Sequence, residues 1–399
     1  MTRLVPSFAL NPAIAGLEPA ASIQLSDRVK MMIADGQNVV DLTIGEPDFD
    51  TPAAIKEAAV QAIAANNTHY VSGRGIPSLR ARIAKKLNEE NGIVCDAGNI
   101  LVTPGAKAAI YVAVRTLLAP GEEAIVLDPS WLSYAAIVQA SGASVRKVEL
   151  SYTGGHSITL EKLETARSAR TRLLIVNSPN NPTGRMLSQE EAGAIASFAS
   201  RYNLCVIADE IYEKIVFDGR SHISLGAIPE IADRVVTING LSKSAAMTGW
   251  RVGYLCANAT LVDRMYMLHQ HVATCISGFA QEAALVALDC TEEVAFMRAA
   301  YEARRNMFVE QLQGVPGVTC RFPEGAFYAW VSFDISRANS MRICEYLLQE
   351  AQVASVPGEA YGLGGENCVR FSLAASEGQL RTAAKRIAAT MEKHSGVLA

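Results

Sequence analysis

The chain has 399 residues, of which 50% are hydrophobic and 19% are charged, and its formal net charge at pH 7 is −4. This length allows two domains, and the composition excludes global disorder because there are enough apolar side chains for a large core. The slightly acidic charge balance argues against a nucleic-acid partner or an anionic membrane surface as a partner.

Cysteine and histidine usage narrows the class of protein further. The eight cysteines are scattered without a Cys-x-x-Cys pair, which is typical of free, buried thiols in a reducing compartment. The six histidines form no ligand cluster, so we expect no metal site. No apolar run reaches membrane-spanning length, and the N-terminus lacks the features of a signal peptide. We therefore expect a soluble, cytoplasmic protein.

Short apolar runs alternate with helical patterns along most of the chain. An extended arm through about Pro19 and a helix over 22–35 precede a short strand at 39–44. Further strands are expected at 100–102, 124–127, 144–148, 173–176, 205–208, 235–238 and 252–256. Helices are expected at 53–65, 77–90, 106–118, 131–141, 189–202 and 260–269. Continuously apolar strands separated by helices predict an α/β fold whose large domain has a mainly parallel sheet covered by helices.

The C-terminal part has a different pattern. A charged helical stretch begins near residue 292, and shorter strands at 327–331 and 369–373 lie on either side of a helix near 341–351. This pattern predicts a smaller α+β domain that also includes the N-terminal arm. We expect an N-terminal arm and part of the small domain at 1–48, the large domain at 49–295 and the small C-terminal domain at 296–399.

Chemically useful residues follow five of the predicted strands. In open parallel sheets, ligands bind beyond the carboxyl ends of the strands. Those ends carry a glycine turn that opens a helix (103–107), Trp131, an amide-rich turn (177–185), Asp209 and Lys243. Each has an ordinary structural explanation, such as a core tryptophan or a lysine whose stem covers apolar surface. The complete set has no such explanation.

Lys243 is the most informative of these residues. It follows the β-branched strand 235–238, which the Asn239-Gly240 turn pattern is expected to end. A desolvated lysine beside a second cation has a lowered pKa and can act as an amine nucleophile, and Arg251 is a candidate for that cation. Together with an aspartate, an aromatic ring and a phosphate-binding turn, such a lysine suits pyridoxal 5′-phosphate (PLP).

The chain resembles the fold-type I, PLP-dependent aminotransferases of class I and II, particularly the bacterial aspartate/prephenate aminotransferase-like branch. The resemblance extends from about Pro19 to the C-terminal helix. It rests on the motifs GEPDFDTP (45–52), YVSGRGIPSLR (70–80), TPGAKAA (103–109), NSPNNPTG (177–184), DEIY (209–212), SKSAAMTGWRVGY (242–254) and VRFSLA (369–374).

The resemblance implies roles toward the cofactor. Lys243 would form the Schiff base, Asp209 would pair with the pyridine nitrogen, and Tyr212 with Asn181 would hydrogen-bond the phenolic oxygen of the ring. Trp131 would stack on the ring. The phosphate would be bound by Gly105 and Ala106 in the N-terminal turn of a helix and by Ser242 and Arg251. Tyr70 would reach it from a neighbouring subunit. Lys107 is also counted among the cofactor-binding residues. We therefore expect a homodimer with shared active sites.

The resemblance also implies how substrate binds. Arg370 would clamp the α-carboxylate of the amino acid in a bidentate pair, assisted by Asn181, Trp131 and the backbone of Gly45. In this branch, a lysine at the place of Lys107 reaches a distal carboxylate, and Ser22 lies where a small hydroxyl residue is common. An exposed lysine at a helix N-terminus explains Lys107 equally well. We expect transfer of an amino group between an acidic L-amino acid and a 2-oxo acid.

Two features depart from the family pattern. Ala245 stands where many relatives have an aromatic residue, so a roomier pocket beside Lys243 is expected. The segment 269–277 replaces a stretch rich in Ser, Thr, Pro and Asn in aspartate-specific relatives, which weakens the prediction of strict aspartate specificity.

Other functions remain open on the sequence alone. A PLP-dependent lyase, cyclase or oxidase would use the same lysine, aspartate and arginine. A regulator that borrowed this fold would need a DNA-binding domain, and the chain has no basic helical segment beyond the fold. A nucleotide-dependent dehydrogenase is disfavoured because no GxGxxG follows a strand and opens a helix.

Overall fold

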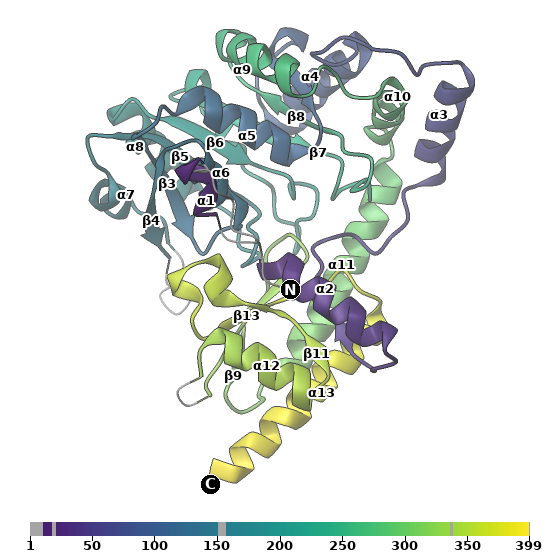
Figure 1. Cartoon of the computed structure of the whole chain (residues 1–399), viewed down its shortest axis with the longest axis vertical. Helices are drawn as coiled ribbons and strands as arrows, with labels where there is room; N and C mark the ends of the chain where they lie inside the picture. Colours follow the sequence, from purple (N-terminus) through teal and green to yellow (C-terminus); the bar gives the residue numbers. More distant parts are fainter. Residues whose placement is uncertain (1–10, 18–20, 151–156, 336–337, 399) are drawn as a thin grey trace, which may run out of the picture.

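A computed structural model describes residues 11–17, 21–150, 157–335 and 338–398. Its largest unit is a seven-stranded sheet with the order β2-β8-β7-β6-β5-β3-β4 (Figure 1). The strands are β2 (Ile100–Thr103), β3 (Glu123–Asp128), β4 (Ser144–Glu149), β5 (Thr171–Asn177), β6 (Cys205–Asp209), β7 (Val235–Gly240) and β8 (Gly253–Cys256). β8 pairs antiparallel with β2 and β7, and the other four strand pairs are parallel, so the predicted mainly parallel sheet is confirmed.

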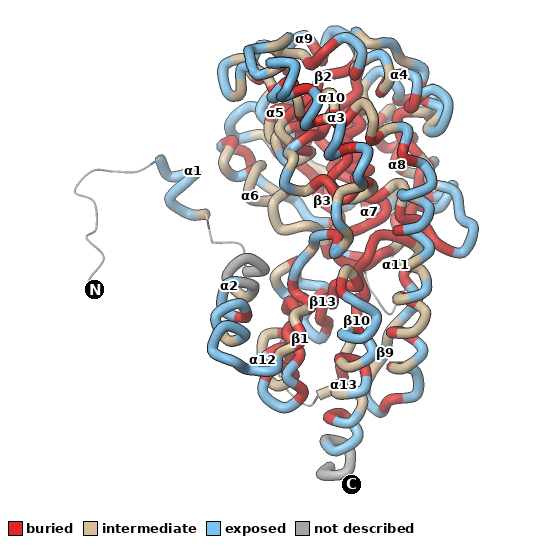
Figure 2. Tube along the Cα trace, turned by 90° about the vertical axis from the view of Figure 1, so that its right-hand side faces the viewer, coloured by how far each residue is buried: buried red, intermediate tan, exposed pale blue. Residues whose placement is uncertain are grey.

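Helices cover both faces of this sheet, and its central strands are apolar on both sides for that reason, whereas the edge strand β4 is mostly exposed. One face packs against α5 (Ala106–Leu117), α6 (Ser133–Ala140) and α9 (Ala259–Val272). The other face packs against α7 (Leu160–Ala166) and α8 (Gln189–Arg201). At the β2 edge, α3 (Ala53–Ala64), α4 (Pro77–Asn91) and α10 (Gly278–Ala287) form a third apolar cluster. Figure 2 shows the buried residues concentrated between these helices.

The smaller part combines the C-terminal segment with residues near the N-terminus. Its four-stranded antiparallel sheet has the order β12-β13-β10-β9, with β9 (Val318–Cys320), β10 (Tyr328–Phe333), β12 (Val356–Pro357) and β13 (Cys368–Ser372). Around it lie α11 (Thr291–Leu312), α12 (Ser340–Glu350) and α13 (Glu377–Leu398), while α1 (Pro12–Ala15) and α2 (Ala21–Ala34) precede it in the chain. The pairing of β1 (Val40–Asp41) with β11 (Val353–Ala354) joins the N-terminal segment to this part.

The predicted α/β fold with a smaller α+β part is therefore confirmed. The domain borders at 48 and 295 stay a prediction, and α11 runs across the second of them (Figure 1). None of the helices in the described ranges is long and apolar enough to span a membrane.

Two local predictions were wrong. The strand expected at 39–44 pairs at only two positions, because its partner β11 is itself two residues long. The expected turn at Asn239-Gly240 is instead the end of β7, where Asn239 pairs with Tyr254 and Gly240 with Gly253. A Cβ on Gly240 would lie 3.0 Å from the Gly253 Cα, so this glycine serves close strand packing and not a turn.

Candidate active site

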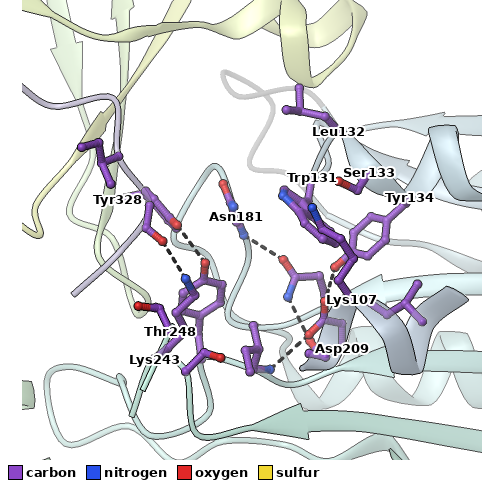
Figure 3. A pocket seen from close by; sticks show the side chains of 18 of the residues that line it. Lys107, Trp131, Leu132, Ser133, Tyr134, Asn181, Asp209, Lys243, Thr248 and Tyr328 are labelled. Carbon is purple, nitrogen blue, oxygen red and sulfur yellow. Dashed lines mark hydrogen bonds between the residues drawn. The ribbon is translucent and has the colours of Figure 1, made fainter. Parts of the chain in front are cut away.

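A cavity of about 450 Å³ lies at the carboxyl ends of the parallel strands (Figure 3). Most of the site residues expected from the sequence line it, although they come from distant parts of the chain. They are Gly45, Ala106, Lys107, Trp131, Asn181, Asp209, Tyr212, Ser242, Lys243, Arg251 and Arg370. Tyr328, Thr43 and two residues of α2, Asp27 and Lys30, also line the cavity. The smaller part therefore forms one wall and the ends of the large sheet form the other.

Lys243 is held at the junction of the two walls. Its Nζ donates a hydrogen bond to the carbonyl oxygen of Gly45 at 2.6 Å. Burial lowers the pKa of Lys243 to about 8, and the positive charges of Arg370 and Arg251 act in the same direction, against Glu46 and Asp209. At pH 7 about a tenth of the Lys243 side chains are therefore uncharged amines, far more than for an ordinary lysine, and this is the form that attacks a carbonyl carbon.

Asp209 ends β6 and is 4% exposed. Its Oδ2 accepts a hydrogen bond from the Tyr134 hydroxyl at 2.6 Å, and its Oδ1 accepts one from the Ile211 backbone N–H at 3.2 Å. Burial raises the pKa of Asp209 to about 6, while the Tyr134 and Ile211 hydrogen bonds and the Lys243 charge oppose the rise. These donors favour the ionised carboxylate in a buried setting.

A turn suited to an anion opens α5. Gly105 is the N-cap of this helix at φ +82°, and no side chain caps the helix. A Cβ on Gly105 would lie 2.3 Å from a guanidinium nitrogen of Arg251, and a Cβ on Gly253 would lie 2.4 Å from the Ala106 nitrogen. The two glycines thus keep the first backbone N–H groups of α5 and the Arg251 charge open, as a phosphate would require.

Arg370, on β13, forms the wall opposite Asp209. Although 4% exposed, it has no carboxylate partner among the described residues; it donates hydrogen bonds to the Thr43 carbonyl at 2.6 Å and to Asn181 Oδ1 at 3.2 Å. Its guanidinium carbon lies 4.5 Å from the centre of the Tyr328 ring, and its Nε has no hydrogen bond within the described part of the chain. A buried arginine with a free donor is suited to a carboxylate ligand.

Aromatic side chains complete the cavity. Trp131 is half-buried and packs edge to face on Tyr134 at 5.2 Å. The Lys107 Nζ lies 4.9 Å from the centre of the Trp131 ring, and burial together with Arg251 lowers the pKa of Lys107. Tyr212 shares a hydrogen bond of 2.8 Å with the Tyr328 hydroxyl beneath Arg370.

Comparison with known proteins identifies the family. The sequence model of the family described as aminotransferase class I and II matches residues 37–387. The chain belongs to the class I and II aminotransferases. It is 37% identical to an aspartate aminotransferase of Geobacillus stearothermophilus over 96% of this chain and 99% of the relative. It is 36% identical to an arginine–pyruvate transaminase of Pseudomonas aeruginosa over 94% of this chain and 95% of the relative.

Solved structures agree with this assignment. The aspartate aminotransferase of Thermus thermophilus with maleate superposes with a TM-score of 0.91 and 36% identity, covering 96% of this chain and all of that one. The protein is therefore an enzyme that transfers amino groups, and its cofactor is PLP. The open turn at Gly105, the amine of Lys243 and the free Nε of Arg370 fit this cofactor and an amino-acid substrate.

Not every predicted residue of the aminotransferase lies in the cavity. Tyr70 is 86% exposed and does not line it. Ser22 lies on α2, but its side chain is outside the described residues. The expectation of a roomier pocket at Ala245 was wrong, because this residue is fully buried in the core around α4 and α10.

Tyr134 and Tyr328 are site residues that sequence reasoning missed. Tyr134 follows Trp131 by three positions, the spacing that puts two side chains on one helix face, and this pattern could have indicated it. Tyr328 begins β10 in the smaller part, and no motif of the predicted site is near it in the sequence.

A cluster of possible metal ligands lies beside the aminotransferase site. Single ligand atoms of Glu210, Glu213 and His222 lie within 4.8 Å of one another. Lys86 contacts Glu213, and although burial alone would lower the pKa of His222, Glu210 and Glu213 raise it. The two carboxylates therefore have cationic partners within the chain, and the absence of a metal site stays a prediction.

The Tyr134 hydroxyl is expected to hold the pKa of Asp209 down. Tyr134→Phe removes a donor that favours the ionised carboxyl, so the midpoint of Asp209 should move from about 6 to higher pH, by about one unit for one hydrogen bond to a charged group. Carbon-13 NMR of the cofactor-free protein with labelled aspartate carboxyls measures this shift, with Asp209→Asn assigning the resonance. Tyr301→Phe, which deletes a buried hydroxyl without a partner in the described part of the chain, is the control. An unchanged midpoint in Tyr134→Phe would contradict the assignment.

Proposed function

We propose that this aminotransferase exchanges an amino group between an acidic L-amino acid and a 2-oxo acid, with Lys243 carrying the cofactor. The observation that carries the proposal is the arrangement around one cavity of an amine with lowered pKa, a buried carboxylate, an open anion-binding turn and a buried arginine. Each group answers one chemical need of the reaction.

The large-sheet side of the cavity would hold the cofactor. Its phosphate would bind at the α5 turn, through Gly105, Ala106, Ser242 and Arg251, and Trp131 would cover one face of its ring. Asp209 would hold the proton on its pyridine nitrogen, and Asn181 and Tyr212 would contact its phenolic oxygen. When bound, PLP supplies an aldehyde that accepts the amine and a ring that withdraws electrons from the substrate Cα.

Lys243 would bind the aldehyde carbon and then move a proton. With a pKa of about 8, the Nζ lies much closer to neutral pH than an ordinary lysine, which suits a general base that takes the Cα proton and later returns it. Gly45 would orient the amine through the 2.6 Å hydrogen bond, and Arg370 with Asn181 would fix the substrate α-carboxylate nearby.

The half-reaction tests the proposed function. Given an L-amino acid alone, the enzyme should stop after one turnover per site and resume when a 2-oxo acid is added. Lys243→Ala should lower kcat at least about a thousandfold because it removes both nucleophile and base, and borohydride should no longer fix the cofactor to residue 243 in a mass spectrum. Lys85→Ala, a substitution at an exposed position of α4, is the control. Continuous product formation without a 2-oxo acid would instead indicate a lyase, cyclase or oxidase.

Lys107 supports an acidic substrate. It reaches the cavity from the first turn of α5, and its ammonium lies over the Trp131 ring, which would cover one face of the cofactor. Neither an ion pair nor a hydrogen bond occupies this ammonium within the described ranges, so its charge is available to a distal carboxylate. The relatives named aspartate aminotransferase are consistent with this preference.

Replacing Lys107 should separate acidic from neutral substrates. Lys107→Gln is expected to lower kcat/KM for aspartate about 10- to 100-fold, the loss of one charge-assisted contact, and to change kcat/KM for alanine less than about threefold. Steady-state kinetics on both substrates measures the difference, with Lys56→Gln on α3 as a control outside the cavity. A loss of equal size on both substrates would remove the argument for Lys107.

A homodimer with shared sites would explain Tyr70. This aromatic side chain is 86% exposed, and Val60 and Ile63 on the preceding α3 are also exposed, which is unusual unless another surface covers them. We place its hydroxyl at the cofactor phosphate of a second copy. The eight free cysteines support a reducing compartment, and we propose the cytoplasm.

Subunit mixing tests the shared site. Lys243→Ala should be inactive and Tyr70→Phe should bind PLP weakly, yet a hybrid dimer contains one site with both native residues. Mixing the two variants should therefore restore activity at wild-type cofactor affinity, measured over a PLP titration. No gain on mixing, or a solution mass near 42.7 kDa by light scattering, would refute the shared site.

A further inference from the structure

A buried tyrosine lies beside the proposed carboxylate clamp without lining the active-site cavity. Tyr361 is 2% exposed, and its ring centre lies 5.2 Å from the guanidinium carbon of Arg370. The Tyr328 ring, which does line the cavity, contacts the same guanidinium at 4.5 Å. Rings at such distances attract an arginine through their π electrons. Both rings therefore limit the orientations that the Arg370 guanidinium can adopt.

Packing fixes the Tyr361 ring in turn. It meets the Trp330 ring edge to face, with the ring centres 5.8 Å apart, and it lies in an apolar cluster with Val356 and Cys368. Leu132, which lines the active-site cavity, packs against this cluster. The Tyr361 hydroxyl makes no hydrogen bond within the described ranges, so the ring and not the hydroxyl determines the position of the side chain.

Residues 358–363, which we call the docking segment, join the smaller part to the end of β3. The Ser130 backbone N–H donates a hydrogen bond to the Tyr361 carbonyl oxygen at 2.9 Å. The Leu363 backbone N–H donates one to Asp128 Oδ2 at 3.2 Å. The backbone that carries the Tyr361 ring is thus tied to the large sheet at two points.

Gly362 permits this close contact. Its φ is +135°, and a Cβ at this position would lie 1.5 Å from Asp128 Oδ1, so any other residue would push the docking segment away from β3. Asp128 is 1% exposed, and the Lys147 Nζ lies 3.3 Å from its Oδ2. The carboxylate on which the docking segment packs therefore has a cationic partner.

The docking segment contacts the surroundings of two site residues that belong to different parts of the molecule. Arg370 lies on β13 of the smaller part, whereas Trp131 follows β3 of the large sheet. The Tyr361 ring contacts the first, and the Tyr361 carbonyl binds Ser130, which directly precedes the second. We propose that Tyr361 is a positioning residue of this aminotransferase, whose ring orients the Arg370 guanidinium and whose backbone ties that arginine to the segment carrying Trp131.

This inference rests on the proposed role of Arg370 as the clamp for the α-carboxylate. Every amino acid and every 2-oxo acid carries that carboxylate, so Tyr361 acts on all substrates alike. Lys107 differs in this respect, because its proposed partner is the distal carboxylate of acidic substrates alone. A change at Tyr361 is therefore expected to weaken binding without altering the preference among substrates.

Maleate binding to the cofactor-loaded enzyme tests the role of the ring. Maleate has two carboxylates and no amino group, so it can occupy the clamp without reacting. In calorimetry, Tyr361→Leu should raise the Kd of maleate about tenfold because the arginine loses one ring contact, whereas Tyr361→Phe should change it less than about twofold. In steady-state kinetics, Tyr361→Leu should raise KM for aspartate and for alanine equally and leave kcat within about threefold.

Two further variants make the result specific. Tyr202→Leu is the matched control, because it removes a ring that Arg167 contacts at 4.1 Å outside the active-site cavity. Arg370→Gln reports on the clamp itself, and maleate binding that survives this substitution would refute the clamp and the inference together. With the clamp intact, wild-type maleate affinity in Tyr361→Leu, or an equal loss in Tyr361→Leu and Tyr361→Phe, would overturn the role of the ring alone.

Gly362→Ala tests the docking segment without changing any ring. The added Cβ would collide with Asp128 and displace the segment from β3, so maleate affinity should fall at least about tenfold. Gly364→Ala is the control in the same segment of chain, because a Cβ there would meet only the Leu150 carbonyl oxygen, at 3.9 Å. Equal maleate affinity in the two variants would contradict the link between the docking segment and the clamp.

Discussion

The environment of the Lys243 amine is the constraint on which the rest of the site depends. The amine has to leave water far enough for its pKa to fall to about 8, yet it needs a hydrogen-bond acceptor, because an unpaired buried ammonium is costly. Gly45 supplies that acceptor from the segment that follows β1, and β1 is held by β11 of the smaller part. The reactive state of a residue on the large sheet therefore depends on a strand pairing in the other part of the molecule.

Asp209 and Arg370, two buried charged residues of the site, have different kinds of hydrogen-bond partners. Asp209 is stabilised as a carboxylate by hydrogen bonds from Tyr134 and Ile211, both within the large-sheet side. Among the described residues, Arg370 donates hydrogen bonds only to neutral acceptors, Thr43 and Asn181, and it lies against the ring of Tyr328. Neutral acceptors do not satisfy a guanidinium charge fully, so the arginine keeps its affinity for an incoming carboxylate. The burial of Arg370 without a carboxylate partner thus lowers the stability of the unliganded protein, and a bound carboxylate restores that stability.

The sequence allowed prediction where chemistry coincides with a strand end. Asp209 and Lys243 follow apolar runs, so the parallel sheet brings them to one edge whatever the details of the helices. Tyr134 could not be placed in the same way, because its bond to Asp209 spans 75 positions and depends on how α6 packs. The prediction of a turn at Asn239-Gly240 was wrong for a related reason. Local propensity favours a turn there, but the pairing of Gly240 with Gly253 overrides it.

The same geometry explains why the fold identifies the cofactor chemistry more sharply than the substrate. Asp209 and Lys243 lie at or just beyond the ends of β6 and β7, neighbouring strands whose register is fixed by the sheet. Other charged residues that line the cavity come from helices: Lys107 from the first turn of α5, and Asp27 and Lys30 from α2. Those helices can change their exposed side chains without disturbing the sheet, so substrate preference can vary while the catalytic edge stays intact. Relatives of nearly equal identity that carry the names of an aspartate and an arginine transaminase agree with this separation.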